Sequence, residues 1–527
     1  MTNRTKNAPV IRPVRNAYLY NMRKGILLLT SFIALVIVVY SGCRRDPIIV
    51  DIPASKYPEA IGKIVLTKCA IPGCHNTQSK EAAAGLDLSS WDKMMEGDRN
   101  GAVCIPYSHD YSTLFLFTNT YSELGPIVRP TMPIGGDSLS IQEVRTLRDW
   151  IDAGAPNADG FVKWSDDPHR KKYYVACQGC DAVCTIDAKT NLQMRYIPVG
   201  ADANIESPHI IKLSPDGEYW YCSFIAGRYI EKHRTSDDAL VGRALLGANQ
   251  TDAVGSWNTL SITPDGKYAM VVDWSFNGRV ALVNLETMQW RRTWQGQGYF
   301  VQPHGSAIQV RNDTTFFIAT ASYGNYIYRM DTLQFPYPNS VNFPDQYQIP
   351  VDGTALPAND SSSSGIHDIA FSPDGTKYYC TGQKSNKVYV MTSDDHYVTT
   401  IPVGGYPQEF AVSNDPTTPY LYVTCMEDLN TYPGNRGSVY VINMNTNTVV
   451  ATVNTGYQPH GLTVNDDDHV VLVANRNAFP GGPAPHHSTS CLGTNGYFTL
   501  IDMNTNTLIP GSKTELIVDP YSAVYRR

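Results

Sequence analysis

The 527-residue sequence predicts a multidomain chain, a small all-α domain followed by an all-β propeller of seven blades. Two observations predict the propeller: a strand-turn-strand unit recurs around a Pro-Asp-Gly turn, and the number of units closes a ring. A third observation, a helical pattern that runs into closely spaced cysteines ahead of the repeats, predicts the separate α domain. The length agrees, because a chain this long exceeds one ordinary domain.

Composition and charge narrow the class of protein further. Tyrosine (33), glycine (40) and proline (34) are plentiful, as in all-β proteins with many turns. The formal net charge is −7, and the chain beyond the N-terminal segment has no long basic or acidic block. The sequence therefore argues against nucleic acid as a partner.

Residues 1–42 are predicted to be a signal peptide with an upstream extension. From Met22 the chain reads MRKGILLLTSFIALVIVVYSGC, in which a basic pair precedes a short apolar run, small residues and a cysteine. The run is shorter than the roughly 18 residues of a spanning helix. The pattern resembles a bacterial lipoprotein signal, which implies that Cys43 is lipidated and that residues 43–54 form a lipidated linker. The alternative is an uncleaved membrane anchor.

Both alternatives place the body of the protein outside the cytoplasm. They predict a protein held at the membrane, by a lipid anchor in the first case, in the periplasm or at the outer-membrane surface. The sequence does not distinguish between these two locations.

The predicted α domain, residues 55–156, opens with a haem-attachment signature. A helix is expected to run through YPEAIGKIVLTK into Cys69, and Cys74 and His75 complete a C-x4-C-H motif. Two thiols can add to the vinyl groups of a haem while the following histidine ligates the iron. The alternative is a Cys69–Cys74 disulfide beside an incidental histidine.

The rest of this domain supports the haem hypothesis. Met132 stands in a Pro/Gly-rich loop, and Ser140 with Glu143 forms a capping box that opens a final helix. Helix, haem motif, methionine loop and final helix, in that order, resemble a monohaem cytochrome c domain of the type found before larger domains in planctomycete and Bacteroidetes proteins. The resemblance implies haem c as cofactor, with His75 as proximal and Met132 as distal ligand.

The propeller is predicted over residues 168–527. The copies SPHIIKLSPDGEYWYCSF, SWNTLSITPDGKYAMVVD and GIHDIAFSPDGTKYYCTG each show strand, turn and strand, and further copies are weaker. The region begins with KKYYVAC, a second strand without a first, and ends with DPYSAVYRR, a first strand without a second. Pairing of the two completes a seventh blade and removes the exposed sheet edges. The repeats resemble the YVTN family of seven-bladed propellers.

The repeat brings one position per blade into register at the start of the innermost strand. Around the ring this position is occupied by Tyr521, His209, Asn258, His304, His367, Gln408 and His460. Because the innermost strands start at the same end of the channel, four imidazoles are expected at one mouth. The loop GPAPHHSTSC, between second and third strands, is expected on the same face and adds His486 and His487.

Neutral imidazole is the commonest protein ligand of copper, zinc and iron. We therefore predict a candidate metal or ligand site, for copper or for a second metal or haem, formed by His209, His304, His367, His460, His486 and His487. The arrangement resembles nitrous oxide reductase in blade number, and the domain order is similar to that of haem-d nitrite reductases. The alternative is structural: the ring nitrogens bond a carbonyl or a channel water.

The remaining histidines and cysteines have simpler interpretations. Four histidines lack the register and are expected at the surface: His169, His233, His396 and His469. Cys222 and Cys380 lie within strands and are expected to be buried thiols. Disulfides are expected among the cysteines near the rim loops, Cys177, Cys180, Cys425 and Cys491, although Cys177 and Cys180 leave a soft-metal site open.

Three functions are compatible with this organisation. The first is an extracytoplasmic oxidoreductase in which haem c exchanges electrons with a centre at the propeller mouth, where Gln408 and Glu409 join the histidines. The second is a non-catalytic electron-transfer lipoprotein whose propeller docks a redox partner protein. The third, a cell-surface adhesin, requires the haem hypothesis to be wrong. Whether the protein is an enzyme is not decided by the sequence.

Overall fold

The computed structural model describes residues 52–296, 300–331, 348–359, 363–415, 417, 419–479, 481–484, 491 and 493–527. The predicted signal segment, Cys43 and the start of the linker lie outside the described residues, as do His486 and His487. Within the described part of the chain, no helix has the length and apolar character needed to cross a bilayer.

The N-terminal part is helical, as predicted. Its α-helices are α2 (Ile52–Ser55), α3 (Glu59–Lys68), α4 (Trp91–Met94), α5 (Thr113–Thr118) and α6 (Ile141–Asp152), and its 3₁₀ turns are η1 (Lys80–Ala82), η2 (His109–Tyr111) and η3 (Ser122–Leu124). Helix α3 has Cys69 as its C-cap and buries Ile61, Ile64 and Val65, which share one helical face. The capping box of Ser140 and Glu143 opens α6 and is confirmed.

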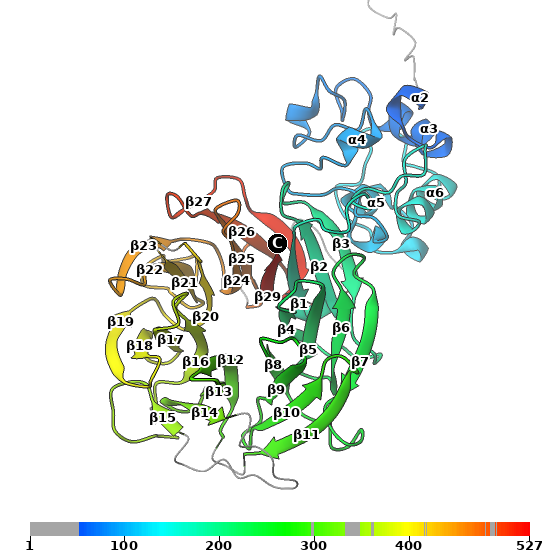
Figure 1. Ribbon diagram of the computed structural model, residues 1–527. Helices are drawn as coiled ribbons and strands as arrows, with labels where there is room; N and C mark the ends of the chain where they lie inside the picture. Colours follow the sequence, from blue (N-terminus) through cyan, green and yellow to red (C-terminus); the bar gives the residue numbers. More distant parts are fainter. Residues whose placement is uncertain are drawn as a thin grey trace, which may run out of the picture. The chain divides into compact units, whose positions relative to one another are not determined.

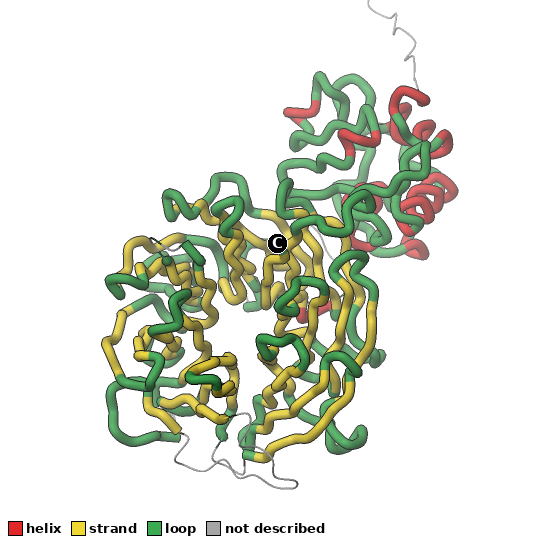
Figure 2. Tube along the Cα trace, viewed as in Figure 1, coloured by secondary structure: helices red, strands yellow, loops and turns green. Residues whose placement is uncertain are grey.

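The described strands form seven antiparallel sheets arranged radially around a central axis, six with four strands and one with five (Figures 1 and 2). The first three blades after the helical part are β4 (Pro208–Leu213), β5 (Tyr219–Phe224), β6 (Tyr229–Arg234), β7 (Leu240–Leu245); β8 (Trp257–Ile262), β9 (Tyr268–Asp273), β10 (Arg279–Asn284), β11 (Gln289–Gln295); and β12 (Pro303–Arg311), β13 (Thr314–Ala321), β14 (Tyr326–Asp331), β15 (Gln348–Pro350). The next three are β16 (Ile366–Phe371), β17 (Lys377–Gly382), β18 (Lys387–Thr392), β19 (Tyr397–Pro402); β20 (Pro407–Val412), β21 (Tyr420–Cys425), β22 (Ser438–Asn443), β23 (Thr448–Val453); and β24 (Pro459–Asn465), β25 (Val470–Asn475), β26 (Asn495–Asp502), β27 (Thr507–Leu508), with β28 (Thr514–Val518) also paired to β26.

The last blade joins the two ends of the propeller. It contains β29 (Pro520–Arg526), β1 (Lys172–Cys177), β2 (Ala182–Asp187) and β3 (Gln193–Pro198), with the 3₁₀ turn η4 (Gln178–Cys180) between β1 and β2. Strand β29 pairs antiparallel with β1, so that Tyr173 faces Tyr525. The predicted seventh blade is therefore confirmed, and the ring closes without exposed inner edges.

Buried hydroxyls connect neighbouring blades at the level of the inner strands. The Thr381 hydroxyl accepts a hydrogen bond from the Asp368 N–H (2.8 Å) and donates to the Gln408 carbonyl of the next blade (2.9 Å). The same donation to the next blade's register residue occurs from Ser223 to Asn258, from Thr320 to His367 and from Thr424 to His460. These bonds fix the positions of the register residues relative to one another along the channel axis.

Glycine is required after two register histidines because the inner strands approach closely. A Cβ atom on Gly305 would lie 2.6 Å from the Cα of Asp368, and one on Gly461 would lie 2.3 Å from the Tyr521 carbonyl oxygen. Such contacts leave no room for a side chain. The Pro-His-Gly sequences at these strand starts therefore fix both the blade spacing and the position of the histidines.

Candidate functional site

The helical part contains a cavity of about 570 Å³. It is lined by Cys69, Cys74, His75 and Met132, which are the four residues that the sequence assigned to haem. The backbone N–H of Met132 donates to the Phe117 carbonyl (2.7 Å), which holds the methionine loop against the cavity wall. The haem motif and Met132, which are far apart in sequence, thus line the same cavity.

The chemistry of these four side chains fits a haem, the cofactor that they were predicted to hold. Cys69 and Cys74 are separate thiols, so the disulfide alternative is not what the structure contains. Burial raises the pKa of Cys69 to about 12, which keeps the thiol protonated. Burial also lowers the pKa of His75, which favours the neutral imidazole that ligates metals.

The remaining walls are mostly apolar, and Lys68, Asp98, Asn100, Thr113 and Thr118 line the rest. The apolar residues include Leu86, Leu88, Val103, Leu114 and Phe117. A volume of several hundred Å³ with apolar walls and a few converging polar groups is typical of cofactor sites. Two thiols, an imidazole, a thioether and this cavity together fit a haem c.

The register residues at the channel mouth form a second cluster. Five aromatic rings make a closed circle with centroid separations of 5.5 Å (His209–His304), 3.7 Å (His304–His367), 5.9 Å (His367–His460), 3.7 Å (His460–Tyr521) and 4.2 Å (Tyr521–His209). All five side chains are buried. The structure therefore brings the four predicted ring histidines together, with a tyrosine as the fifth member.

A repeated backbone bend aims these side chains into the channel. The residue before the strand-opening proline has positive φ in five blades: Ser207, Gln302, Tyr406, Gln458 and Asp519. Non-glycine residues seldom adopt this conformation, and the bend recurs at the mouth of the channel. The sequence signal for it is the proline that precedes the register residue.

His209 and His304 face each other through nitrogen atoms. Their Nε2 atoms lie 3.3 Å apart, and the Gln178 amide nitrogen lies 2.5 Å from Nδ1 of His209. Burial lowers the pKa of His304 to about 4, and burial followed by the charge of His304 holds the pKa of His209 well below its usual range. Both rings are therefore neutral near pH 7.

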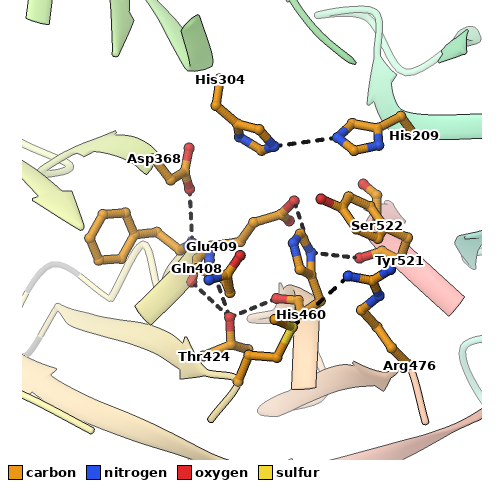
Figure 3. Close-up of polar contacts among 12 residues, drawn as sticks. His209, His304, Asp368, Gln408, Glu409, Thr424, His460, Arg476, Tyr521 and Ser522 are labelled. Carbon is orange, nitrogen blue, oxygen red and sulfur yellow. Dashed lines mark hydrogen bonds and ion pairs between the residues drawn. The ribbon is translucent and has the colours of Figure 1, made fainter. Parts of the chain in front are cut away.

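His460 has different partners on the opposite side of the circle (Figure 3). Its Nδ1 atom lies 3.2 Å from the Tyr521 carbonyl oxygen and 3.4 Å from a carboxyl oxygen of Glu409. Burial, with the nearby charge of Asp368, raises the pKa of Glu409 to about 8. The guanidinium of Arg476 lies 4.7 Å from the centre of the Tyr521 ring.

Sequence reasoning missed several groups that complete this cluster. Gln178 comes from the η4 turn of the closing blade, and Arg476 follows β25 and pairs with Asp519 (2.6 Å). Asp368 occupies the position after the register residue His367, as Glu409 does after Gln408, so the repeat alignment carried a signal for it. No sequence signal pointed to Gln178, since its position next to His209 depends on closure of the propeller.

The ring histidines do not surround a single metal position as expected from the sequence. Among the described residues, no group of three or more His, Cys, Asp and Glu side chains is placed to hold a metal ion. Nε2 of His209 faces Nε2 of His304, Nδ1 of His209 faces the Gln178 amide, and Nδ1 of His460 faces the Tyr521 carbonyl and Glu409. The two remaining predicted members, His486 and His487, lie outside the described residues, so the six-histidine site stays a prediction.

The other histidines and cysteines mostly follow expectation. His169, His396 and His469 are exposed, and Cys222 and Cys380 are buried thiols. His233 was predicted at the surface and is buried instead: its ring stacks on Trp220 (3.9 Å), and Nε2 lies 2.9 Å from Glu231.

One disulfide forms among the described cysteines near the rim loops. It links Cys180 to Cys491, whereas Cys177 and Cys425 are buried thiols. Because Cys180 is paired, a soft-metal site with Cys177 does not form.

Comparisons with known proteins find similarity among solved structures alone. No family model and no curated protein matches the sequence, so membership of the YVTN family stays a prediction. Similar solved structures include hydrazine synthase of Kuenenia stuttgartiensis (16% identity, 58% of this chain and 79% of that one, TM-score 0.41) and a functionally unknown protein from Desulfotomaculum acetoxidans DSM 771 (12%, 66% and 99%, 0.42). A third is the dihydro-heme d1 dehydrogenase NirN in complex with DHE (13%, 85% and 97%, 0.41). The protein is a seven-bladed β-propeller with an N-terminal helical part.

Proposed function

We propose that the protein is an extracytoplasmic electron-transfer protein that carries one covalently bound haem c in its helical part and acts as an oxidoreductase. The observation that carries this proposal is that Cys69, Cys74, His75 and Met132 line one mostly apolar cavity. When bound there, haem supplies one-electron redox chemistry.

Each residue has a distinct part in holding this group. The two thiols would anchor it covalently, and the His75 imidazole and the Met132 thioether would ligate its iron. The mostly apolar walls suit the haem's hydrocarbon surface, and the hydrogen bond from the Met132 N–H to the Phe117 carbonyl holds the methionine loop at the cavity. In this proposal, residues 55–156 are the cytochrome c domain.

The second centre of the proposed oxidoreductase lies at the propeller mouth. Neutral imidazoles, the buried carboxyl of Glu409 and the cation of Arg476 offer a metal, substrate or proton-binding environment there. Copper is the metal proposed for this centre, since it suits imidazole ligands and exchanges single electrons.

We propose attachment to the membrane through a lipid on Cys43, with a redox protein as partner. The Cys180–Cys491 disulfide supports an oxidising compartment.

Metal analysis of protein matured with its haem tests the two-centre proposal. Iron at one atom per chain together with copper is the expected result. Iron alone, with only a c-type spectrum, would contradict the second centre and leave the haem in place. Absence of iron would contradict the haem assignment itself.

A specific observation favours a second candidate function, a non-catalytic electron carrier whose propeller docks a partner. The Nδ1 atom of His460 is already within hydrogen-bond distance of the Tyr521 carbonyl, as a structural role requires. In that case His460→Ala should lower the free energy of unfolding and leave the haem iron content per chain unchanged.

A further inference from the structure

The Gln178 side chain contacts His209 at Nδ1, the ring nitrogen that faces away from His304. It is held firmly in that place. Its backbone N–H donates to the Asp519 carbonyl (2.9 Å), and the disulfide at Cys180 fixes the same η4 turn. With about a tenth of its surface exposed (9%), its amide is directed at the ring by the fold.

The amide group determines which nitrogen of His209 carries the proton. With the NH₂ group toward Nδ1, as in the structure, Nδ1 accepts and the ring proton sits on Nε2. That proton then lies between the two Nε2 atoms, 3.3 Å apart, so His209 donates to His304. The pair is thereby bridged by one proton and has no lone pair free for a metal.

Turning the amide by half a turn reverses this arrangement. The carbonyl oxygen of Gln178 then accepts from Nδ1–H, and Nε2 of His209 presents a lone pair beside that of His304. The ring stays neutral, because one proton leaves Nε2 and one arrives on Nδ1. Two nitrogens bound to one metal at about 2.0–2.1 Å with tetrahedral angles lie about 3.3 Å apart, which matches the observed separation.

We propose that His209 and His304 form a two-nitrogen site for a first-row divalent metal ion, and that Gln178 is its positioning residue, selecting between the proton-bridged and the metal-binding pair. Two protein nitrogens leave further coordination positions for water or an external ligand. This inference rests on the proposed second centre and specifies its ligands. A partner on the distal nitrogen is what commonly sets the affinity of a metal-binding histidine.

Two substitutions of Gln178 should change metal affinity in opposite directions. Gln178→Glu supplies only acceptor atoms to Nδ1–H and should tighten Zn²⁺ binding by about tenfold. Gln178→Leu removes the acceptor and should weaken binding by about 10- to 100-fold. A merely structural role for Gln178 would weaken binding in both variants, so the opposite signs are diagnostic.

The test is calorimetric titration of Zn²⁺ into the untagged, haem-loaded chain. Gln383→Leu is the matched control, because this half-buried amide donates to Gln408 rather than to a histidine, and it should leave the affinity unchanged. His209→Gln and His304→Gln should each abolish binding at this site.

Three outcomes would overturn the inference. Binding that responds to the histidine variants but not to either Gln178 variant removes the role of Gln178 and leaves the proposed second centre standing. Binding that survives both histidine variants places the metal elsewhere. No Zn²⁺ binding by the unmodified chain removes the two-nitrogen site, while the haem assignment is judged by its own spectrum.

Discussion

At the scale of single residues, the mouth of the channel is a place where burial decides ionisation. His209, His304, His367 and His460 are all buried, and burial lowers the pKa of each. The same burial acts in the opposite direction on Glu409, since it disfavours the charged carboxylate. Neutral imidazoles and a largely protonated carboxyl are therefore the state of this cluster near neutral pH.

Glu409 should impose a pH dependence on stability. Its pKa is about 8 in the folded protein against an ordinary value of 4.5, so the folded state retains a proton that the unfolded state has lost. The free energy of unfolding should therefore fall as pH rises from about 4.5 to about 8, by at most about 1.4 kcal/mol per pH unit, and then level off.

Substitution isolates this contribution. Glu409→Gln should flatten the fall, as measured by urea unfolding at a series of pH values, whereas the exposed Glu96→Gln should not. Equal slopes in the Glu409→Gln variant and the unmodified protein would show that the carboxyl is ionised throughout.

At the scale of elements, the inner strands are held in register by hydroxyls that bridge adjacent blades. Thr381 satisfies both the Asp368 N–H and the Gln408 carbonyl, and it is fully buried. Buried backbone groups left without partners carry a desolvation penalty. The register of the histidine ring thus depends on polar bonds as well as on apolar packing.

Thr381→Val should test this bridge with little change in shape. It leaves an N–H and a carbonyl unpaired and should lower the free energy of unfolding by about 1–3 kcal/mol. Thr448→Val, on the exposed outer strand β23, should cost much less. Denaturant unfolding of both variants gives the comparison; equal losses would show that the bridge contributes nothing.

The elements also show which features a sequence can predict. The strand-turn-strand copies around Pro-Asp-Gly predicted the blades, and one register position per copy predicted the ring, because both are local signals that repeat along the chain. Gln178 could not be predicted, since η4 reaches His209 only after β29 has closed the ring. The prediction that His233 lies at the surface was wrong for a similar reason. Its ring stacks on Trp220 and contacts Glu231 in the interior, and neither contact has a local sequence pattern.

At the scale of the whole molecule, two connections join the ends of the propeller. Strand β29 pairs with β1, and the Cys180–Cys491 disulfide links the closing blade to the blade before it in the ring. The cysteines are 311 residues apart in sequence. A cross-link over so long a segment restricts the unfolded chain strongly.

Removal of this disulfide should destabilise the propeller. The Cys180→Ser, Cys491→Ser double variant should lose about 2–4 kcal/mol in the free energy of unfolding. Unfolding curves with and without a reductant check this, because the reductant should destabilise the unmodified protein and leave the double variant unchanged. A double variant as stable as the unmodified protein would contradict the prediction.

The whole-molecule account depends on a redox group in the helical part that serves the propeller. The most direct test is the intact mass and visible spectrum of the chain expressed with a c-type haem maturation system. We predict one covalent haem per chain, lost when Cys69 and Cys74 are both replaced by Ala, and a lowered reduction potential in Met132→Ala, because a thioether ligand raises that potential. A mass equal to the polypeptide alone, with Cys69 and Cys74 joined to each other, would contradict the account.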